Sequence, residues 1–548
     1  MSGGNFDNSL NLSKAILRRD RLTIIVWVVS LAVFSVLLAP GMNAMFPDEE
    51  ARLTVAQVYD NPIMVSMMGP IYGIGDAGGF NAGAMYSGFM LIWVIIAAAF
   101  MNIFFVVRHT RADEERGRAE VVRSLPVGRL ANLNATMISA VAVNAALALL
   151  TGVGIALTGV EGMGWGGSML YGAALGAAGL VFAAIAALFC QLSASSSGAA
   201  AYSGIALGAL YMIRAGGDAK GAEIVSCISP LGLAQRTQVY VNNYIWPVLV
   251  LLLTAAVFTA AAYWLNAIRD LGQGFIAAKP GRSEASKSLQ SPFGLSWRLL
   301  RTALISWVIV MFLLGASYGS IMEDLPNIVG DSPDYLQVIG IPEDIVKTMT
   351  NDEKAGIIIE YFGAFITLMM TLVCIVPVLN AAMRPRAEER EGRAEHIIAR
   401  AVPRWKYMSG FITLAFAASV LLQFAMASGL YLVTDSVMET NPFVFGELMK
   451  AYFSFLPAIW VMIGFAVCVT GLFPKATGAI WGFYGFVAFI SFIGRSLDLP
   501  KWINSISPLY HIPPLEEFTA APLAVLTVVA AALTAAGFWA FGKRDSMA

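Results

Sequence analysis

The chain has 548 residues, of which 58% are hydrophobic and only 13% are charged, and its formal net charge is −1. A water-soluble globular protein has about 45–50% apolar and about 25% charged residues. These proportions exclude an ordinary soluble enzyme, a nucleic-acid-binding protein and a disordered chain, and the mean hydropathy of +0.70 indicates a protein of the lipid bilayer.

Twelve apolar segments follow one another along the chain, and most have the length that a membrane-spanning helix needs. A helix of about 20 residues crosses about 30 Å of hydrocarbon, and lipid offers no hydrogen-bond partners to an unpaired backbone. The sequence therefore predicts an all-α membrane protein with twelve transmembrane helices, of which 198–213 and 478–494 are short for a span. The predicted spans are 22–39, 86–107, 133–158, 169–190, 198–213, 244–266, 303–321, 358–382, 408–433, 449–472, 478–494 and 522–542.

Amphipathic segments come before the first and the seventh span. In 10–21, apolar residues share one face of a helix and basic residues cover the rest, which is typical of a helix lying on the membrane surface. A weaker version recurs at 295–301, and the alternative is that both segments are simple positive flanks of a span. The predicted apolar face of the first helix consists of Leu12, Ala15, Ile16 and Leu22.

A charged block between the second and third spans recurs between the eighth and ninth. Residues 111–120 read R-A-D-E-E-R-G-R-A-E and residues 386–395 read R-A-E-E-R-E-G-R-A-E, so seven of ten positions are identical. Opposite charges four residues apart predict a short exposed helix, and a glycine in each block indicates a helix end or a close backbone approach. The predicted pairs are Glu114–Arg118, Arg116–Glu120 and Glu389–Arg393, and the glycines are Gly117 and Gly392.

The two blocks have two interpretations. A solvated loop on the positive side of the membrane explains their arginine content. It does not explain their glutamate content or their near-identity, which favour a docking surface used twice by a partner with twofold symmetry.

Basic residues are distributed unevenly between the two sides of the predicted membrane. The side that carries both termini and both charged blocks has 26 of the 35 Lys and Arg residues. Loops rich in these residues stay in the cytoplasm, so both termini are predicted to be cytoplasmic.

A second repeat supports a chain built from two similar parts. Ile-Ser-Pro-Leu at 228–231 recurs at 506–509, with nearly the same offset as the charged blocks. Six spans in each part place the two repeats in parallel, related by an axis along the membrane normal. The predicted parts are a first half at 1–270, a cytoplasmic linker at 271–294 and a second half at 295–548.

Residues that could carry chemistry are sparse. No G-x-x-x-x-G-K-[ST] loop for the phosphates of ATP occurs, the four cysteines form no C-x-x-C pair, and the three histidines stand far apart. We therefore expect no catalytic residue, metal or cofactor in this chain. It is interpreted as a transport pathway whose driving energy comes from another source.

The order of elements resembles a known family. Each half is predicted to have an interfacial helix, a span, an outer loop, a span, a charged cytoplasmic helix and four more spans. This order resembles the membrane subunit of ATP-binding cassette exporters of the type 2 permease family, and more narrowly the single-chain, two-half permeases of polyketide or tetronasin-like antibiotic exporters of Gram-positive bacteria. The resemblance covers nearly the whole chain, and its most specific element is the repeated R-A-[DE]-E-x-x-G-R-A-E block. The outer loops at 40–85 and 322–357 are longer than in the simplest members.

The resemblance implies a transport subunit of a bacterial plasma (inner) membrane that is not itself an enzyme. Two copies of a separately encoded ATPase would bind ATP and Mg, close together and press on two coupling helices. The two halves would then open outward by alternating access. The implied coupling residues are Arg111, Asp113, Glu114, Arg116, Gly117, Arg118, Glu120, Arg386, Glu388, Glu389, Gly392, Arg393 and Glu395.

The resemblance also implies a cargo cavity lined mainly by the second and fifth spans of each half. Aromatic and methionine side chains with few charges suit a hydrophobic or amphipathic, drug-like small molecule. In a span, such side chains more often face lipid or pack between helices. The candidate lining residues are Phe89, Trp93, Tyr202, Tyr211, Phe365, Met369, Trp481 and Phe486.

Two alternatives remain at this point. A secondary transporter of the major facilitator type also has two parallel six-span halves. It carries a shorter loop between the second and third spans, with a motif whose spacing the block at 111–120 does not match. A membrane-embedded enzyme is the other alternative, and the lack of a convergent acid, base and nucleophile disfavours it.

Overall fold

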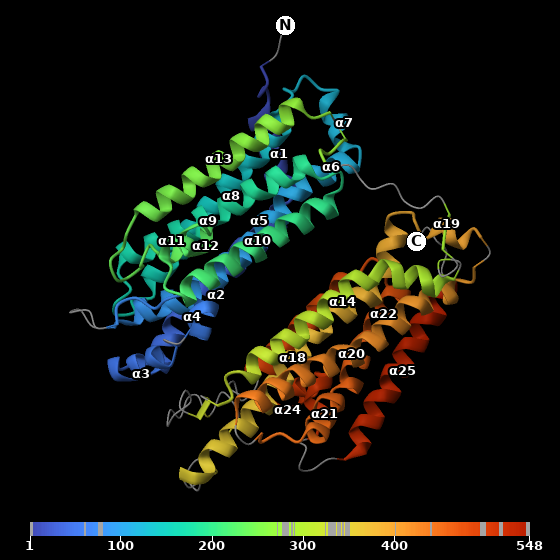
Figure 1. Ribbon diagram of the computed structural model, residues 1–548. Helices are drawn as coiled ribbons and strands as arrows, with labels where there is room; N and C mark the ends of the chain where they lie inside the picture. The colour runs from blue at the N-terminus through green and yellow to red at the C-terminus, as the bar shows by residue number, and fades with distance from the viewer. Residues whose placement is uncertain are drawn as a thin grey trace. The chain divides into compact units, whose positions relative to one another are not determined.

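The computed structural model describes residues 4–59, 62–74, 80–270, 272–276, 284–286, 289, 291–323, 325–326, 336, 341, 345, 351–400, 402–438, 441–493, 500–513 and 519–543. Within these residues the regular structure is helical, and the only β-type pairing is an isolated bridge between Ser193 and Ile276. The predicted all-α class is therefore confirmed. The chain divides into two compact units, Met1–Pro280 and Gly281–Ala548 (Figure 1).

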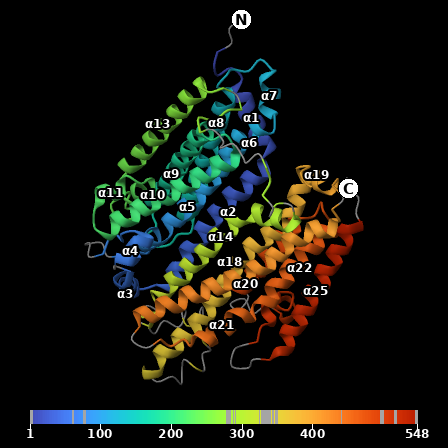
Figure 2. The ribbon, with the colours of Figure 1, turned by 45° about the vertical axis from the view of Figure 1, so that its right-hand side comes forward.

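The first unit contains a bundle of long helices with short helices at both ends (Figures 1 and 2). Its helices are α1 (Ser9–Arg19), α2 (Arg21–Met45), α3 (Glu49–Tyr59), α4 (Pro62–Met68), α5 (Ala82–His109), α6 (Arg111–Glu115), α7 (Arg118–Arg123), α8 (Ala131–Leu157), α9 (Trp165–Leu192), α10 (Ser196–Ala219), α11 (Glu223–Cys227), α12 (Pro230–Gln235) and α13 (Trp246–Ile268).

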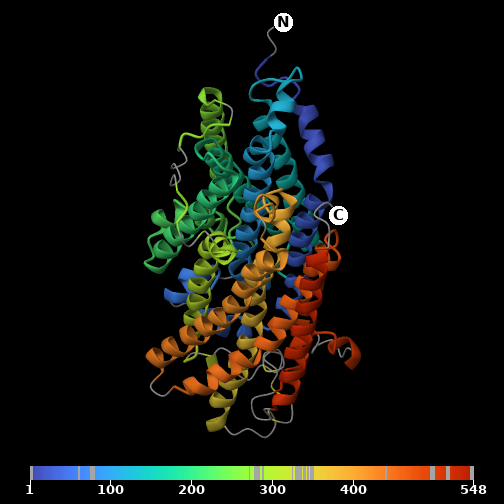
Figure 3. The ribbon, with the colours of Figure 1, turned by 90° about the vertical axis from the view of Figure 1, so that its right-hand side faces the viewer.

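The second unit is also a bundle, with α25 running along its side in each view (red in Figures 2 and 3). Its helices are α14 (Pro292–Gly319), α18 (Asn351–Arg390), α19 (Glu395–Ile398), α20 (Arg404–Val437), α21 (Phe445–Ser454), α22 (Leu456–Leu472), α23 (Gly478–Ile493), α24 (Lys501–Asn504), η2 (Pro508–His511) and α25 (Ala520–Lys543).

Ten helices of the described residues are long and apolar enough to cross a membrane, and they cover ten of the twelve predicted spans. The other two predictions, 198–213 and 478–494, are not confirmed as spans. The first lies in α10, whose last turns carry Arg214 and Asp218 and so shorten its apolar stretch. The second lies in α23, whose 16 residues reach roughly 24 Å at 1.5 Å per residue, less than the hydrocarbon thickness.

The core of the first unit forms around α9, which packs against α5, α8 and α13. Small residues make this central position possible, because they let helix backbones approach closely. A Cβ atom added to Gly172 would lie 2.1 Å from the carbonyl oxygen of Ala148 on α8, and one on Gly176 would lie 2.9 Å from that of Asn144. The small residues of this apolar segment therefore help to determine which helices pack against it.

Close helix contacts of the same kind hold the second unit together. α14 packs against α20, and α22 packs against α25. A Cβ atom on Gly315 would lie 2.2 Å from the carbonyl oxygen of Met426, and one on Gly429 would lie 2.1 Å from that of Phe312. In each unit, the helix of the first predicted span therefore packs on the helix that follows the charged block. These pairs are α2 with α8 and α14 with α20.

The predicted interfacial helices are only partly correct. α1 forms at Ser9–Arg19, but it packs on α8 through Ser9, Ser13 and Ile16, whereas Ala15 of the predicted apolar face is exposed. The Ser13 and Ser139 hydroxyl oxygens lie 2.8 Å apart, so small polar side chains allow the close contact. The second segment, 295–301, is no separate helix, because it forms the first turns of α14.

The end of the first unit opposite α6 and α7 carries short helices that sequence reasoning placed only as loops. α3 and α4 follow α2, and α11 and α12 follow α10 (Figure 1). The Ile-Ser-Pro-Leu repeat has a local reason here, since the Ser229 hydroxyl accepts a hydrogen bond from the Leu231 amide at 3.3 Å and caps α12. In the second unit the same motif precedes η2.

Candidate functional site

The first charged block folds as a helix–turn–helix rather than as one helix. α5 ends at His109, α6 follows directly, and Gly117 then adopts a left-handed conformation with φ of 69°. This conformation is strained for residues with a Cβ atom, so the glycine ends α6 and lets α7 begin in a new direction. The end of the first unit that holds α6 and α7 is here called the basic end.

The second charged block has the same backbone plan. The long helix α18 ends at Arg390, Gly392 adopts a left-handed conformation with φ of 73°, and α19 follows. The prediction of a helix end at each glycine is therefore confirmed. The prediction of one short continuous helix is wrong, because each glycine interrupts it.

The interruption changes which charges pair. In the first block, Arg111 pairs with Glu114 at 2.8 Å, and Arg118 pairs with Asp113 at 3.2 Å. At the equivalent positions of the second block, the two corresponding pairs have distances of 3.3 and 2.5 Å. These equivalent pairs are Arg386–Glu389 and Arg393–Glu388. The repeated sequence thus forms the same two ion pairs twice, at spacings of three and five residues instead of the predicted four.

The first arginine of each block fastens it to the loop after the fourth predicted span, which follows α9 in the first unit and α22 in the second, and Arg111 also bonds to the segment after α13. Arg111 donates to the carbonyl of Ala194 at 2.5 Å and to those of Gly272 and Gln273 at 2.7 and 3.0 Å. Arg386 donates to the carbonyl of Pro474 at 3.1 Å. Each block is therefore bonded to its own bundle.

A buried carboxylate lies between two arginines in each block. Asp113 accepts from Arg118 and, at 2.9 Å, from Arg19 at the end of α1. Glu388 accepts from Arg393 and forms an ion pair, at 2.7 Å, with Arg384, which occupies the position of His109 in the repeat. The first block therefore takes its second arginine from the N-terminal helix, and the second block takes it from its own helix.

Exposure separates the predicted coupling residues into two groups. Arg111, Asp113 and Glu388 are buried, with exposed fractions of 1%, 8% and 4%, so they hold the block together and cannot form a broad contact with a partner. The exposed residues form what is here called the tip of each block. The first tip consists of Glu115, Arg116, Arg118 and Glu120, and the second consists of Arg390, Glu391, Arg393 and Glu395.

Charge balance at the tips differs in detail between the two units. The hydrogen bond to Glu388 raises the pKa of the Arg393 guanidinium above its usual value, so this arginine stays charged at any working pH. Glu115 of the first block accepts from the backbone amide of Ser196 at 2.8 Å, which ties it to the start of α10. Its counterpart in the repeat is Arg390, so the two tips offer a partner similar but not identical charges.

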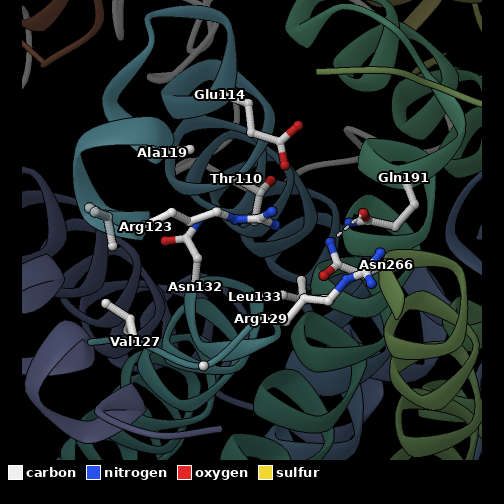
Figure 4. Close-up of a pocket in the computed structure, with 12 residues that line it drawn as sticks. Thr110, Glu114, Ala119, Arg123, Val127, Arg129, Asn132, Leu133, Gln191 and Asn266 are labelled. Carbon is white, nitrogen blue, oxygen red and sulfur yellow. Dashed lines mark hydrogen bonds between the residues drawn. The ribbon is translucent and has the colours of Figure 1, made fainter. Parts of the chain in front are cut away.

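A hollow lies beside the first block at the basic end (Figure 4). Together with the open solvent at its mouth it measures about 460 Å³. The ends of α5, α8, α9 and α13 and the turn after α7 surround it. Its polar lining consists of Thr110, Glu114, Arg123, Arg129, Asn132, Gln191 and Asn266.

The predicted cavity residues are spread over four helices. In the first unit, Phe89 is buried against Tyr59, with ring centroids 4.7 Å apart, and the Tyr211 hydroxyl donates to the carbonyl of Met67 at 2.9 Å. The other residues keep part of their surface exposed and remain candidates for a lining role. These are Trp93 and Tyr202 in the first unit, and Phe365, Met369, Trp481 and Phe486 in the second.

Comparison with known proteins gives a match over nearly the whole chain. A family model described as "Multidrug efflux system permease Rv1217c, C-terminal domain" matches residues 15–265 and 289–542. The chain belongs to this permease family. The multidrug efflux system permease protein Rv1217c of Mycobacterium tuberculosis (strain ATCC 25618 / H37Rv) is 34% identical over 553 residues, covering 99% of this chain and 96% of that protein.

Several residues of the permease that organise the blocks were missed by sequence reasoning. Asp20 lies at the boundary of α1 and α2, where it accepts from Arg108 at 3.0 Å and lies 2.9 Å from the Nε2 atom of His109. Arg269 pairs with Glu114 at 2.5 Å from the end of α13. A signal existed for Asp20, since it is an acid within a basic flank. Arg269 follows its span as an ordinary basic flank does, so its sequence context gave no such signal.

Proposed function

We propose that this chain is the permease subunit of a multidrug exporter and moves hydrophobic or amphipathic small molecules out of the cell. The observation that carries the proposal is the full-length match to a multidrug efflux system permease. Ten helices with the length and composition of membrane spans support it. The major-facilitator alternative is not favoured, because that class lacks the long helix–turn–helix block between its second and third spans.

The driving energy in this proposal comes from a separate ATP-binding cassette ATPase, two copies of which dock on the two charged blocks. What supports this is the repeated construction of the blocks. Both have the same left-handed glycine, the same two ion pairs and the same fastening arginine, and both present charged tips. A rigid, twice-built surface suits a partner that arrives in two equivalent copies and applies force to the helices behind it.

The proposal includes a chain of two six-span halves joined by a linker near 271–294. The division into two compact units and the two separate stretches matched by the family model support it. In this arrangement α10 and α23 serve as the fifth helix of each half, and both termini are cytoplasmic in a bacterial inner membrane. The relation to polyketide or tetronasin-like antibiotic exporters is proposed on the block motif alone.

The docking role predicts that reversing one charge at each tip releases the ATPase. Glu120 and Glu395 are suitable because both are exposed and occupy equivalent positions after the glycine. We expect the double variant Glu120→Lys and Glu395→Lys to retain at least tenfold less ATPase during co-purification, since like charges placed at an interface cost several kcal/mol. The full chain is co-expressed with the ATPase, and bound ATPase and its hydrolysis rate are measured.

A matched control is available at the opposite end of the first unit. Glu161 is an exposed acid in the turn between α8 and α9, so Glu161→Lys makes one charge reversal of the same kind without touching a block. This variant should retain the ATPase like the unmodified chain. The docking assignment is wrong if the double variant binds as well as the control, and the ATPase proposal fails if no ATPase binds the unmodified chain.

A further inference from the structure

The hollow at the basic end of the first unit is lined by more basic than acidic side chains (Figure 4). Its one carboxylate, Glu114, is fully used, because Arg111 pairs with one oxygen at 2.8 Å and Arg269 with the other at 2.5 Å. Two more arginines, Arg123 and Arg129, also line the hollow. Four guanidinium groups thus surround a single carboxylate, and the site carries an excess of positive charge.

The two lining arginines have donors to spare. Among the described residues, the Arg123 side chain has no hydrogen-bond acceptor and no ion-pair partner, and Figure 4 shows it extending between Thr110 and Asn132. Arg129 donates to the carbonyl of Arg269 at 3.3 Å, which leaves its remaining N–H groups available. Arg269 is 7% exposed, and its buried Nε atom has no hydrogen-bond partner in the part of the chain that the structure describes.

The surroundings of Arg123 favour an added negative charge. Partial burial lowers the pKa of its guanidinium, Glu114 acts in the opposite direction, and the nearby charges of Arg129 and Arg269 lower it further. An anion placed among these groups would relieve the repulsion between them. The rest of the polar lining carries no charge. Two of these neutral groups, the Asn266 and Gln191 amides, are hydrogen-bonded to each other at 2.8 Å.

The second unit provides a natural comparison. Arg123 and Arg129 stand three residues before and after Pro126, and the second unit has exposed basic residues three residues before and after Pro403, but the neutral amide pair is replaced. Gln191 precedes Leu192 as Gly471 precedes Leu472, and Asn266 lies two residues after Trp264 as Phe541 lies two residues after Trp539. The basic counterparts of Arg123 and Arg129 are Arg400 and Lys406, and Phe541 is 1% exposed.

We propose that the hollow of the first unit is a binding site for a phosphate group, held by Arg123 and Arg129 between α7 and the ends of α8, α9 and α13. Guanidinium groups bind phosphate oxygens through paired, charge-assisted hydrogen bonds. The site opens where several predicted spans end, so the headgroup of an anionic phospholipid can reach it from the membrane, and a soluble phosphate can reach it from water. A bound phosphate would brace α7 against the bundle and so stiffen the first block.

The test measures binding to the purified full-length chain in detergent. The probes are phosphatidylglycerol, the zwitterionic phosphatidylcholine as a comparison, and inorganic phosphate as a competitor, with retained lipids counted by native mass spectrometry. We expect the unmodified chain to bind phosphatidylglycerol at least tenfold more tightly than phosphatidylcholine. The double variant Arg123→Gln and Arg129→Gln should lose this preference, since each charge-assisted hydrogen bond contributes about tenfold or more.

Two further variants make the result decisive. Arg123→Lys with Arg129→Lys keeps the charge and should keep most of the binding, which separates a lost ligand from a lost fold. Arg400→Gln with Lys406→Gln removes the same charge from the second unit and should leave binding unchanged. Binding of inorganic phosphate without a preference for phosphatidylglycerol would support the site and identify a soluble ligand. Equal binding by the unmodified chain and the Arg123/Arg129 glutamine variant, or an equal loss in the second-unit variant, would overturn the proposal.

Discussion

Replacing Arg111 by alanine is expected to destabilise the first unit by about 3–5 kcal/mol, the range for removing one partner of a buried ion pair. Arg111 is 1% exposed and donates to the Glu114 carboxylate and to three backbone carbonyls, those of Ala194, Gly272 and Gln273. Alanine would leave the carbonyls of Ala194 and Gly272 without this donor, while Glu114 and Gln273 would keep only Arg269. It would also free α6 from the loop after α9. The first block should therefore lose both its stability and its fixed orientation.

The second block offers the matched comparison. Arg386 occupies the same place in the repeat, but its side chain is 23% exposed, and it donates to the carbonyl of Pro474 and to Glu389. Water can replace part of these contacts, so Arg386→Ala should cost only about 1 kcal/mol, as an ordinary hydrogen bond does. Arg111→Lys should fall in between, because an ammonium group lacks the planar fork that reaches several acceptors at once.

Thermal denaturation of the three purified variants in the same detergent measures these differences. The midpoint should fall most for Arg111→Ala and least for Arg386→Ala. A control outside the block, the exposed Arg116→Ala, should leave the midpoint unchanged. Equal effects of Arg111→Ala and Arg386→Ala would contradict the role of the carbonyl contacts, because those contacts are the main difference between the two sites.

Sequence reasoning worked where one local property decides the structure. Ten of the predicted spans coincide with helices that are long and apolar enough to cross a membrane, because length and apolar content are local properties of the sequence. The same reasoning was insufficient for 198–213, because the helix that contains it continues past its apolar stretch into buried charges. It also missed that 295–301 continues into α14, since nothing in a short basic stretch shows whether a helix ends there.

The charged blocks show what a sequence repeat can and cannot predict about a structure. Near-identity of 111–120 and 386–395 correctly singled out two equivalent structures. The pairing rule of four residues failed because it assumes an unbroken helix, and a left-handed glycine stands in each block. The partners of Arg111 could not be predicted at all, since two of its carbonyl acceptors lie 83 and 161 residues away and any residue could supply them.

The division into buried and exposed charges changes how the blocks should be tested. Glu114 has the character of an interface residue in the sequence, but the structure uses both of its oxygens internally. Reversing its charge would disturb the block itself, and a lost partner would then say nothing about the docking surface. Variants at Glu120 and Glu395 avoid this difficulty, because these two exposed side chains are not members of the internal ion pairs of the blocks.

Replacing Arg214 by alanine is expected to have a similarly large effect at the opposite end of the first unit, again about 3–5 kcal/mol. Arg214 is fully buried and donates to the carbonyls of Ser66 and Met67, at 2.5 and 3.0 Å, while it pairs with Asp218 at 3.4 Å. These carbonyls belong to the last turn of α4, where a helix leaves its carbonyls without partners and favours a positive charge. Arg214 therefore fastens the segment of α3 and α4 to α10.

Local opening of this segment can be measured separately from global unfolding. Arg52 in α3 is a trypsin site whose guanidinium donates to the carbonyls of Phe46 and Phe80 in the closed segment. Tryptic cleavage there should be faster in Arg214→Ala than in the unmodified chain, because cleavage reports the population of the opened state.

A double variant shows whether the buried charge itself is responsible. Arg214→Met with Asp218→Leu removes both partners. Arg236, which also lies 3.8 Å from Asp218, keeps its pair with Glu223 at 2.8 Å, so part of the lost stability should return. The α4 carbonyls would still lack their donor, and cleavage at Arg52 should therefore remain fast. Slow cleavage in both variants would mean that Tyr211 and Gln235, which donate to Met67 and Met68, are enough to hold the segment closed. In that case Arg214 would act only within α10, and movement of α10 during transport would not be transmitted to the α3–α4 segment through this arginine.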